Sequence, residues 1–244
     1  MANVLQDTIN YITPFCRYQE ADIGNSLMPI IGIGNITRNI ILAAPFTWRF
    51  NRNSVALTGT ANPPGVVQGT QDYVQTISDF GFLEKVTASG SDGKVFELKD
   101  VKNNEALASS TTQGRPEAIS AFNDDLQGNI TFRLSAVPNA SYNVNLVYQK
   151  APVQFASLTD KWAPIPDSFS DVYNNLCLGY YMDSCQDPRA QQYIARGIAG
   201  LLARAQGLTA MDKALFAASY LNFNAQQLLE MMKTQQGQQA QGAR

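Results

Sequence analysis

The sequence predicts an α+β protein in which helices at both ends of the chain flank an antiparallel β domain. Three observations support this prediction: apolar residues recur at helical spacing near both ends, they alternate at a spacing of two in the middle, and a proline-containing segment follows the alternating region. We therefore divide the chain into N-terminal helices (1–46), an antiparallel β domain (47–150), a proline-containing linker (151–167), C-terminal helices (168–233) and a Gln/Gly-rich tail (234–244).

Two helices are predicted before the β domain, over Asp7 to Phe15 and over Ser26 to Ala44. In the second, Leu27, Ile30 and Ile31 begin an apolar face that continues to Leu42, as expected for a helix with one buried side. Pro45 should end this helix, because the residue before a proline is driven out of helical backbone geometry.

The clearest predicted strands are Ile130 to Ala136 and Tyr142 to Tyr148, in which apolar and polar residues alternate. The turn-forming sequence Pro138-Asn139-Ala140 lies between them and predicts that they pair as a hairpin. Turn sequences with Gly, Pro and Asp separate the earlier predicted strands, which are 48–57, 73–77, 82–88 and 95–98.

The linker contains Pro152, Pro164 and Pro166, which favour an extended path. Three helices are predicted after it. Asp167 or Ser168 should cap the first helix.

The second of these helices should begin with Asp187 as N-cap and end near Gly207, and the third should begin at Thr209 with Asp212 as its capping-box partner. On the third helix a narrow seam of small and apolar residues alternates steps of four and three, so another helix could approach closely. The seam consists of Ala214, Ala218, Leu221, Ala225, Leu228 and Met232.

The tail after Lys233 has no apolar residue larger than alanine, so it cannot bury itself. We expect it to become ordered on a partner surface. Together with the seam, it forms a candidate interface with other subunits or a partner, contributed in the tail by Gln235, Gln236, Gln238, Gln239 and Arg244.

The absence of histidine is the strongest argument against an enzyme, because it excludes Ser-His-Asp and Cys-His catalysis and the commonest zinc and iron sites. Cys16, Cys177 and Cys185 show no CxxC spacing and are expected to be free thiols. We therefore predict no catalytic residue, no cofactor and no metal. A hydrolase that uses Asp124 or Asp167 stays open as a lesser alternative.

The charge balance argues against a protein whose main role is to bind nucleic acid, because the sequence has 18 Lys and Arg residues and 20 Asp and Glu residues, and so lacks an excess of positive charge. A local basic strip formed by Arg38, Arg49 and Arg52 stays open. No apolar run approaches the roughly 20 residues that span a bilayer, so we expect a cytoplasmic protein without a membrane partner.

One segment carries a resemblance to a known family: FRLSAVPNASYNVNLVYQKAPVQFASLTDKWAPIPDSFSDVYNNLCLGYYMDS, residues 132–184. Its order of strand, Pro-containing turn, strand, Leu158-Thr159-Asp160, Ile165-Pro166-Asp167 and helix resembles the head-to-tail adaptors of tailed bacteriophages, also called connector, neck or tail-tubular type A proteins. The likeness extends to APFTWRFNR at 44–52 and so covers most of the chain.

This resemblance implies a helical bundle formed by both chain ends with the β domain inserted between them. It also implies a virion structural protein at the head–tail junction, assembled in the host cytoplasm as a homo-oligomeric ring, commonly of twelve copies. The ring would join the portal protein, through the C-terminal helix and tail, to tail nozzle or fibre proteins. Double-stranded DNA would pass through its channel without sequence-specific binding.

Two alternatives stay open beside the adaptor ring. The first is another neck or tail component, acting in tail completion or fibre attachment. The second, less favoured, is a virion-associated glycan hydrolase.

Overall fold

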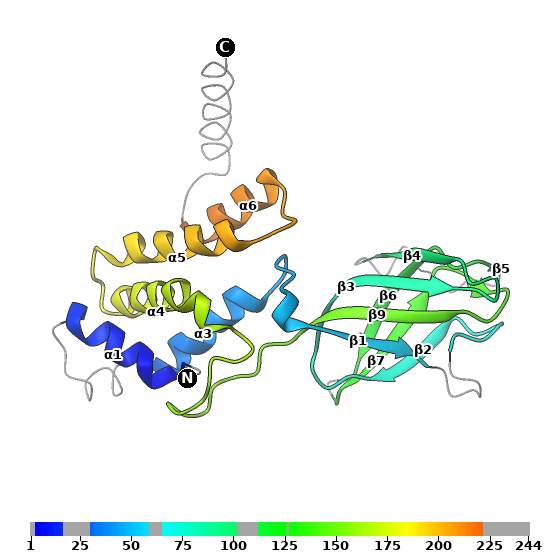
Figure 1. Cartoon of the computed structure of the whole chain (residues 1–244), viewed down its shortest axis with the longest axis horizontal. Helices are drawn as coiled ribbons and strands as arrows, with labels where there is room; N and C mark the ends of the chain where they lie inside the picture. The colour runs from blue at the N-terminus through cyan, green and yellow to red at the C-terminus, as the bar shows by residue number, and fades with distance from the viewer. Residues whose placement is uncertain (1–2, 17–29, 59–64, 102–111, 126, 222–244) are drawn as a thin grey trace, which may run out of the picture. The chain divides into compact units, whose positions relative to one another are not determined.

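The computed structural model describes residues 3–16, 30–58, 65–101, 112–125 and 127–221 (Figure 1). The chain forms two compact units: one comprises the described parts of Met1–Phe50 and Val153–Arg244, and the other those of Asn51–Pro152. The first unit is helical and the second is a β domain inserted into it. The predicted α+β class with an inserted β domain is confirmed.

The helical unit combines helices from both ends of the chain. Its helix α4 contacts α1, α3 and α5, and α6 contacts α5. Buried residues at helical spacing, such as Leu5, Ile9 and Ile12 on α1, supply the core. The helices are α1 (Leu5–Cys16), α3 (Ile30–Leu42), α4 (Ser170–Ser184), α5 (Ala190–Arg204) and α6 (Ala210–Leu221), with the short 3-10 helices η1 (Arg49–Asn51) and η3 (Asp167–Phe169).

The predicted helices are present with shifted ends. The first begins at Leu5 and the second ends at Leu42, three residues before Pro45; its predicted beginning at 26–29 lies outside the described residues. No side-chain cap is found for η3, α4 or α5, so the predicted caps Asp167, Ser168 and Asp187 are wrong. The Asp187 carboxylate instead accepts a hydrogen bond from the Arg189 backbone N–H, one residue before α5.

Helices α4 and α5 pack closely because glycines lie at their contact. A Cβ atom at Gly179 would come within 2.6 Å of Cγ1 of Ile194, and one at Gly197 within 2.6 Å of Cγ of Leu176. Such distances are too short for carbon atoms, so each position requires glycine.

The predicted linker, 151–167, has no helix or strand before η3, yet from Val153 onwards it belongs to the helical unit. Phe155, Trp162 and Ile165 are buried there. The side chain of Asn35 on α3 accepts a hydrogen bond from the Phe155 backbone N–H at 2.6 Å and donates one to its carbonyl at 3.3 Å. This segment is therefore fixed to α3 by specific contacts.

Arg38, also on α3, strengthens the same attachment from a position only 4% exposed. Its guanidinium donates to the carbonyl oxygens of Val153, Trp162 and Ala163. Burial lowers the pKa of Arg38, and the nearby Tyr173 and Asp160 partly oppose that effect. The hypothesis of a basic strip through Arg38 is therefore wrong, because this charge is used inside the protein.

The β domain contains a seven-stranded sheet in the order β1-β9-β3-β4-β6-β7-β2 and a separate pair β5-β8. Most neighbours are antiparallel, but β4 and β6 are parallel, as are β5 and β8. The strands are β1 (Arg52–Leu57), β2 (Asp72–Thr76), β3 (Phe80–Ser89), β4 (Val95–Asp100), β5 (Gln113–Gly114), β6 (Ala118–Asp124), β7 (Asn129–Leu134), β8 (Val137–Pro138) and β9 (Asn143–Lys150).

The predicted hairpin between the two clearest strands is wrong. Strand β7 pairs with β2 and β6, whereas β9 pairs with β1 and β3. Pro138 lies in β8, which pairs with β5. Alternation identifies which face of a strand is buried, but it does not identify the neighbouring strand.

The earlier predicted strands correspond to β1, β2, β3 and β4, but β5, β6 and β8 were not predicted. The first predicted strand begins too early. Trp48 packs in the helical core and is followed by η1, so β1 begins only at Arg52.

Side chains link the two edge strands of the sheet. The backbone N–H and Oγ1 of Thr58, directly after β1, both lie 3.1 Å from Oε1 of Gln75 on β2. The sheet therefore curls until its edges meet around the second core, which includes Leu57, Tyr73 and Phe132.

Candidate assembly surfaces

The predicted interface helix begins as expected. Thr209 and Asp212 form a capping box, in which Oγ1 of Thr209 accepts the Asp212 N–H at 3.1 Å and the Asp212 carboxylate accepts the Thr209 N–H at 3.2 Å. This pair satisfies backbone donors that the first turn of α6 leaves open. The capping-box prediction is confirmed.

The seam of this helix is partly used within the chain. Ala214 is only 3% exposed, and Ala217, which was not predicted, is 7% exposed. Ala218 and Leu221 are half-buried. In the conformation seen here, Ala214 packs inside the helical unit and does not present itself to another subunit.

The other residues of the predicted interface lie outside the described residues, and their role stays a prediction. They are Ala225, Leu228, Met232, Gln235, Gln236, Gln238, Gln239 and Arg244.

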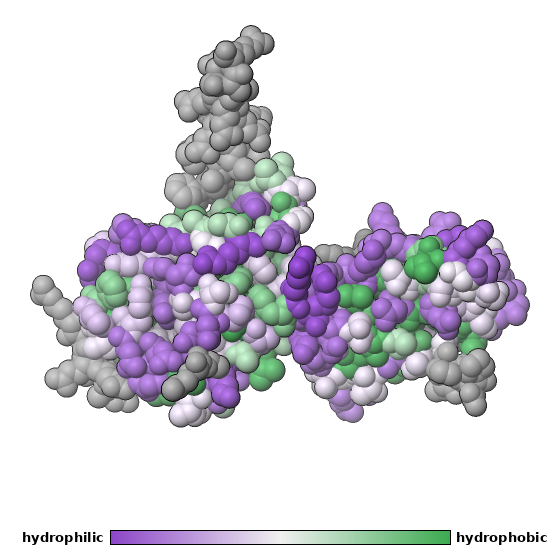
Figure 2. Space-filling model, in the orientation of Figure 1, coloured by the Kyte–Doolittle hydropathy of each residue, from purple (hydrophilic) through white to green (hydrophobic). Residues whose placement is uncertain are grey.

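Two apolar residues that border the seam on α6 are exposed. Met211 and Leu215 lie one turn apart and are 49% and 51% exposed. Figure 2 shows hydrophobic residues at the surface over α6, whereas the surface over α5 is mainly hydrophilic. These two residues were not predicted as part of an interface, although their spacing of four places them on one side of the helix.

An aromatic hollow of about 240 Å³ lies in the helical unit beside η1. The rings of Trp48 and Phe50 stack with centroids 5.6 Å apart, and Phe169 meets both edge-on at 5.2 and 5.4 Å. Nε1 of Trp48 donates to the Ile41 carbonyl, which fixes the indole. Arg204 also lines the hollow, but its guanidinium is paired with Asp171 at 2.9 Å.

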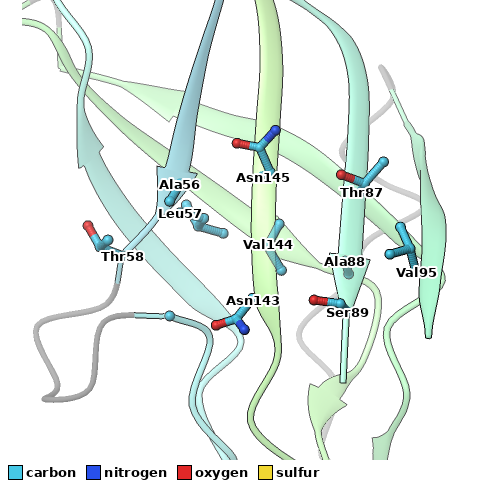
Figure 3. A pocket seen from close by; sticks show the side chains of 11 residues that line it. Ala56, Leu57, Thr58, Thr87, Ala88, Ser89, Val95, Asn143, Val144 and Asn145 are labelled. Atoms are coloured by element: carbon cyan, nitrogen blue, oxygen red, sulfur yellow. The ribbon is translucent and has the colours of Figure 1, made fainter. Parts of the chain in front are cut away.

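A second hollow of about 280 Å³ lies on the β domain, where β1, β9, β3 and β4 run side by side (Figure 3). Its amide and hydroxyl side chains include Asn143, Asn145 and Thr87, and none of its lining residues is charged. These groups can exchange hydrogen bonds with a neutral polar surface, but they offer no reactive group.

A third hollow of about 340 Å³ lies beside the turn between β3 and β4. Its wall includes Phe96 and Tyr142, whose rings meet edge-on at 5.8 Å. The guanidinium of Arg115 lies 3.6 Å above the Phe96 ring. The Tyr142 hydroxyl donates to the Asn139 side chain at 2.8 Å. This hollow combines aromatic and cationic groups.

The carboxylates considered for hydrolysis belong to different units. Asp124 belongs to the β domain, and Asp167 belongs to the helical unit, where its carboxylate accepts a hydrogen bond from the Asn3 backbone N–H at 3.2 Å. Asp160 accepts the backbone N–H groups of Ala156 and Ser157, which lowers its pKa. These hydrogen bonds give the carboxylates structural roles.

The thiols differ in their surroundings. Cys177 is a free, buried cysteine, and burial raises its pKa to about 12, which disfavours the reactive thiolate. Cys185 is free and exposed, and the side chain of Cys16 lies outside what the structure describes. Within the described ranges, no three His, Cys, Asp or Glu residues group as metal ligands.

None of the helices in the described part of the chain is both long and apolar enough to cross a membrane.

Comparison with protein families gives a match over most of the chain. The model described as SU10 adaptor protein matches residues 46–243, which is the greater part of the chain and includes the β domain and the helices after it. No curated protein matches the chain.

Proposed function

Because the chain belongs to the SU10 adaptor protein family and is thus a structural adaptor protein of a bacteriophage virion, we propose that it forms a ring joining the portal to the tail. The family match over residues 46–243 carries this proposal. In the proposed ring, twelve copies surround a channel through which DNA passes, at the head–tail junction.

The surfaces of the chain support a role that depends on contacts. The exposed pair Met211 and Leu215 on α6 offers apolar area to a neighbour, and its burial would favour association. The β domain offers two further hollows. We propose that these surfaces bind neighbouring subunits and tail proteins, and that the protein catalyses no reaction.

The portal contact is proposed for the C-terminal end of the chain. The apolar residues of the seam after Leu221 and the glutamines of the tail lie outside the described residues, and we propose them as the binding segment on the basis of their sequence. Ordering such a polar tail costs conformational entropy, which a partner surface must offset.

Native mass spectrometry of the purified chain, alone and with the portal protein of the same phage, tests the proposal. We expect rings in at least the second sample, and we expect truncation after Lys233 to weaken portal binding. A chain that stays monomeric with portal present, and a truncation that leaves binding unchanged, would together contradict the proposal.

A further inference from the structure

The β domain contains three described arginines, and two of them hold a carboxylate by two hydrogen bonds. Arg133 donates from Nε and Nη2 to the two carboxylate oxygens of Asp72, at 2.7 and 2.8 Å. Arg52 binds Glu84 in the same two-point manner. Arg115 forms no ion pair with any carboxylate in the described part of the chain.

Arg115 nevertheless has the same aromatic support as one of the paired arginines. Its guanidinium lies 3.6 Å from the centre of the Phe96 ring, and that of Arg133 lies 3.8 Å from the centre of the Phe122 ring. Stacking on a ring covers one face of the planar guanidinium and leaves the N–H groups at its edge free to donate. The Arg133 site therefore shows a completed form of the arrangement at Arg115.

The surroundings of Arg115 leave room for a partner group. The hollow of about 340 Å³ beside it is also lined by Ser91, Lys94 and Tyr142. Ser91 can donate a hydrogen bond, and the rings of Phe96 and Tyr142 can contact an apolar side chain.

The other charges at this hollow are Asp92 and Lys94. Oδ1 of Asp92 accepts the Lys94 backbone N–H at 3.1 Å, and its Oδ2 lies 4.0 Å from Nζ of Lys94. Lys94, on the same turn, thus offsets the negative charge of the Asp92 carboxylate. The positive charge of Arg115 remains, which favours an anionic partner.

Within the β domain, the hollow lies at the end opposite to the two chain connections. Arg52 pairs with Gln149 where the chain enters and leaves the sheet, whereas Ser89 pairs with Asn143 and Val95 at the other end of β3. The turn after Ser89 forms part of the hollow. This end of the domain is therefore free of the connections to the helical unit.

We propose that Arg115, stacked on Phe96, is a receptor for an aspartate or glutamate side chain on an exposed segment of another virion protein. The identification of the partner as a virion protein rests on the proposed function, but carboxylate binding at Arg115 does not. A carboxylate flanked by an apolar residue matches the guanidinium and the two rings together.

The test uses the full chain as a monomer and a blocked hexaglutamate peptide, with hexaglutamine as the neutral probe. We expect hexaglutamate to shift the Nε–H NMR resonance of Arg115 in a saturable way and to leave that of Arg133 in place, because Asp72 already occupies the latter. Arg115→Lys, which keeps the charge but loses the planar fork, should weaken binding by about five-fold.

Lys94→Gln is the matched control, because it removes one positive charge from the same hollow without touching the stacked pair. It should weaken binding less than Arg115→Lys. Equal losses in the two variants, or equal shifts at Arg115 and Arg133, would indicate unspecific attraction and overturn the proposal.

Two further probes separate other partners. Polygalacturonate carries carboxylates on a sugar chain, so binding of it without binding of hexaglutamate would overturn the assignment to a protein segment. Glu105 lies outside the described residues and is tested as an internal partner. If Glu105→Gln shifts the Nε–H resonance of Arg115 in the absence of any peptide, Arg115 binds this carboxylate of its own chain and the proposal is overturned. All these measurements use the monomer, so they test carboxylate binding independently of ring formation. Arg115 can fail to bind hexaglutamate in a protein that forms rings, and it can bind hexaglutamate in a protein that forms none.

Discussion

Arg38 and Val153 are 115 residues apart in the chain, yet Nη1 of Arg38 donates a 2.7 Å hydrogen bond to the Val153 carbonyl oxygen. The same guanidinium lies 4.2 Å from the centre of the Phe155 ring. A helix that precedes the β domain thus fixes the segment that follows it. This contact explains how two distant parts of the sequence form one helical unit.

Arg38→Met should destabilise the helical unit by about 3 kcal/mol, because buried carbonyl oxygens lose their donors. The measurement is denaturant unfolding followed by circular dichroism. Arg189→Met, which removes an arginine paired with Asp187 at the surface, is the control and should cost less than about 1 kcal/mol. Equal stability of the two variants would show that Arg38 does not hold the segment.

Gly179→Ala should destabilise the protein by about 1–3 kcal/mol, because the added methyl group would meet Ile194 on α5. Gly32→Ala on α3 is the matched control, since a Cβ there meets no atom within 4 Å. Alanine is the better helix former, so the control should gain up to about 1 kcal/mol. Thermal unfolding compares them, and a stabilising Gly179→Ala would refute the close α4–α5 packing.

Tyr148 should titrate late, because burial, and then its hydrogen bond to Asp79, raise its pKa to about 12. The folded state holds this proton more tightly than the unfolded state, so the contribution to stability is present below about pH 10 and is lost as the pH rises towards 12. Asp79→Asn should lower the Tyr148 pKa only part of the way, because burial remains. A ¹³Cζ NMR titration measures it, and an unchanged pKa in Asp79→Asn would exclude the role of Asp79.

The exposed and buried faces of α6 should respond differently to substitution. Leu215→Ser changes a half-exposed side chain, so we expect the monomer to keep its stability within about 0.5 kcal/mol and ring formation to weaken. Ala214→Leu should instead destabilise the monomer by about 1–3 kcal/mol, because Ala214 is buried and a larger side chain must displace its neighbours. Denaturant unfolding measures the stability of each variant, and native mass spectrometry measures its ring formation. Normal ring formation by Leu215→Ser would show that Leu215 is not part of the interface.

Sequence patterns predicted the type of most elements but not the long-range contacts between them. The alternation in β7 and β9 identified the right strands. Of their partners, β6 directly precedes β7 but was not predicted, whereas β2, β1 and β3 come from distant parts of the chain. The capping box at Thr209 was predictable because it depends on residues three apart.

The side-chain roles at the surfaces were harder to predict for the same reason. Arg38 and Arg115 both look like ordinary surface cations in the sequence. Arg38 is buried because carbonyl groups from residues 115 and more positions away surround it. Arg115, which follows β5, is distinguished by its contact with Phe96 on β4. Neither environment leaves a local pattern in the sequence.

The pairing of Arg52 with Gln149 places the entry and the exit of the β domain on adjacent strands. Their Cα atoms are then separated by about 5 Å, as across any antiparallel pair. A short glycine-rich bridge from Phe50 to Val153 could therefore replace the domain while every contact of Arg38 is kept. The helical unit can therefore accept a different insert between Phe50 and Val153, so the β domain can change without a redesign of the helical core.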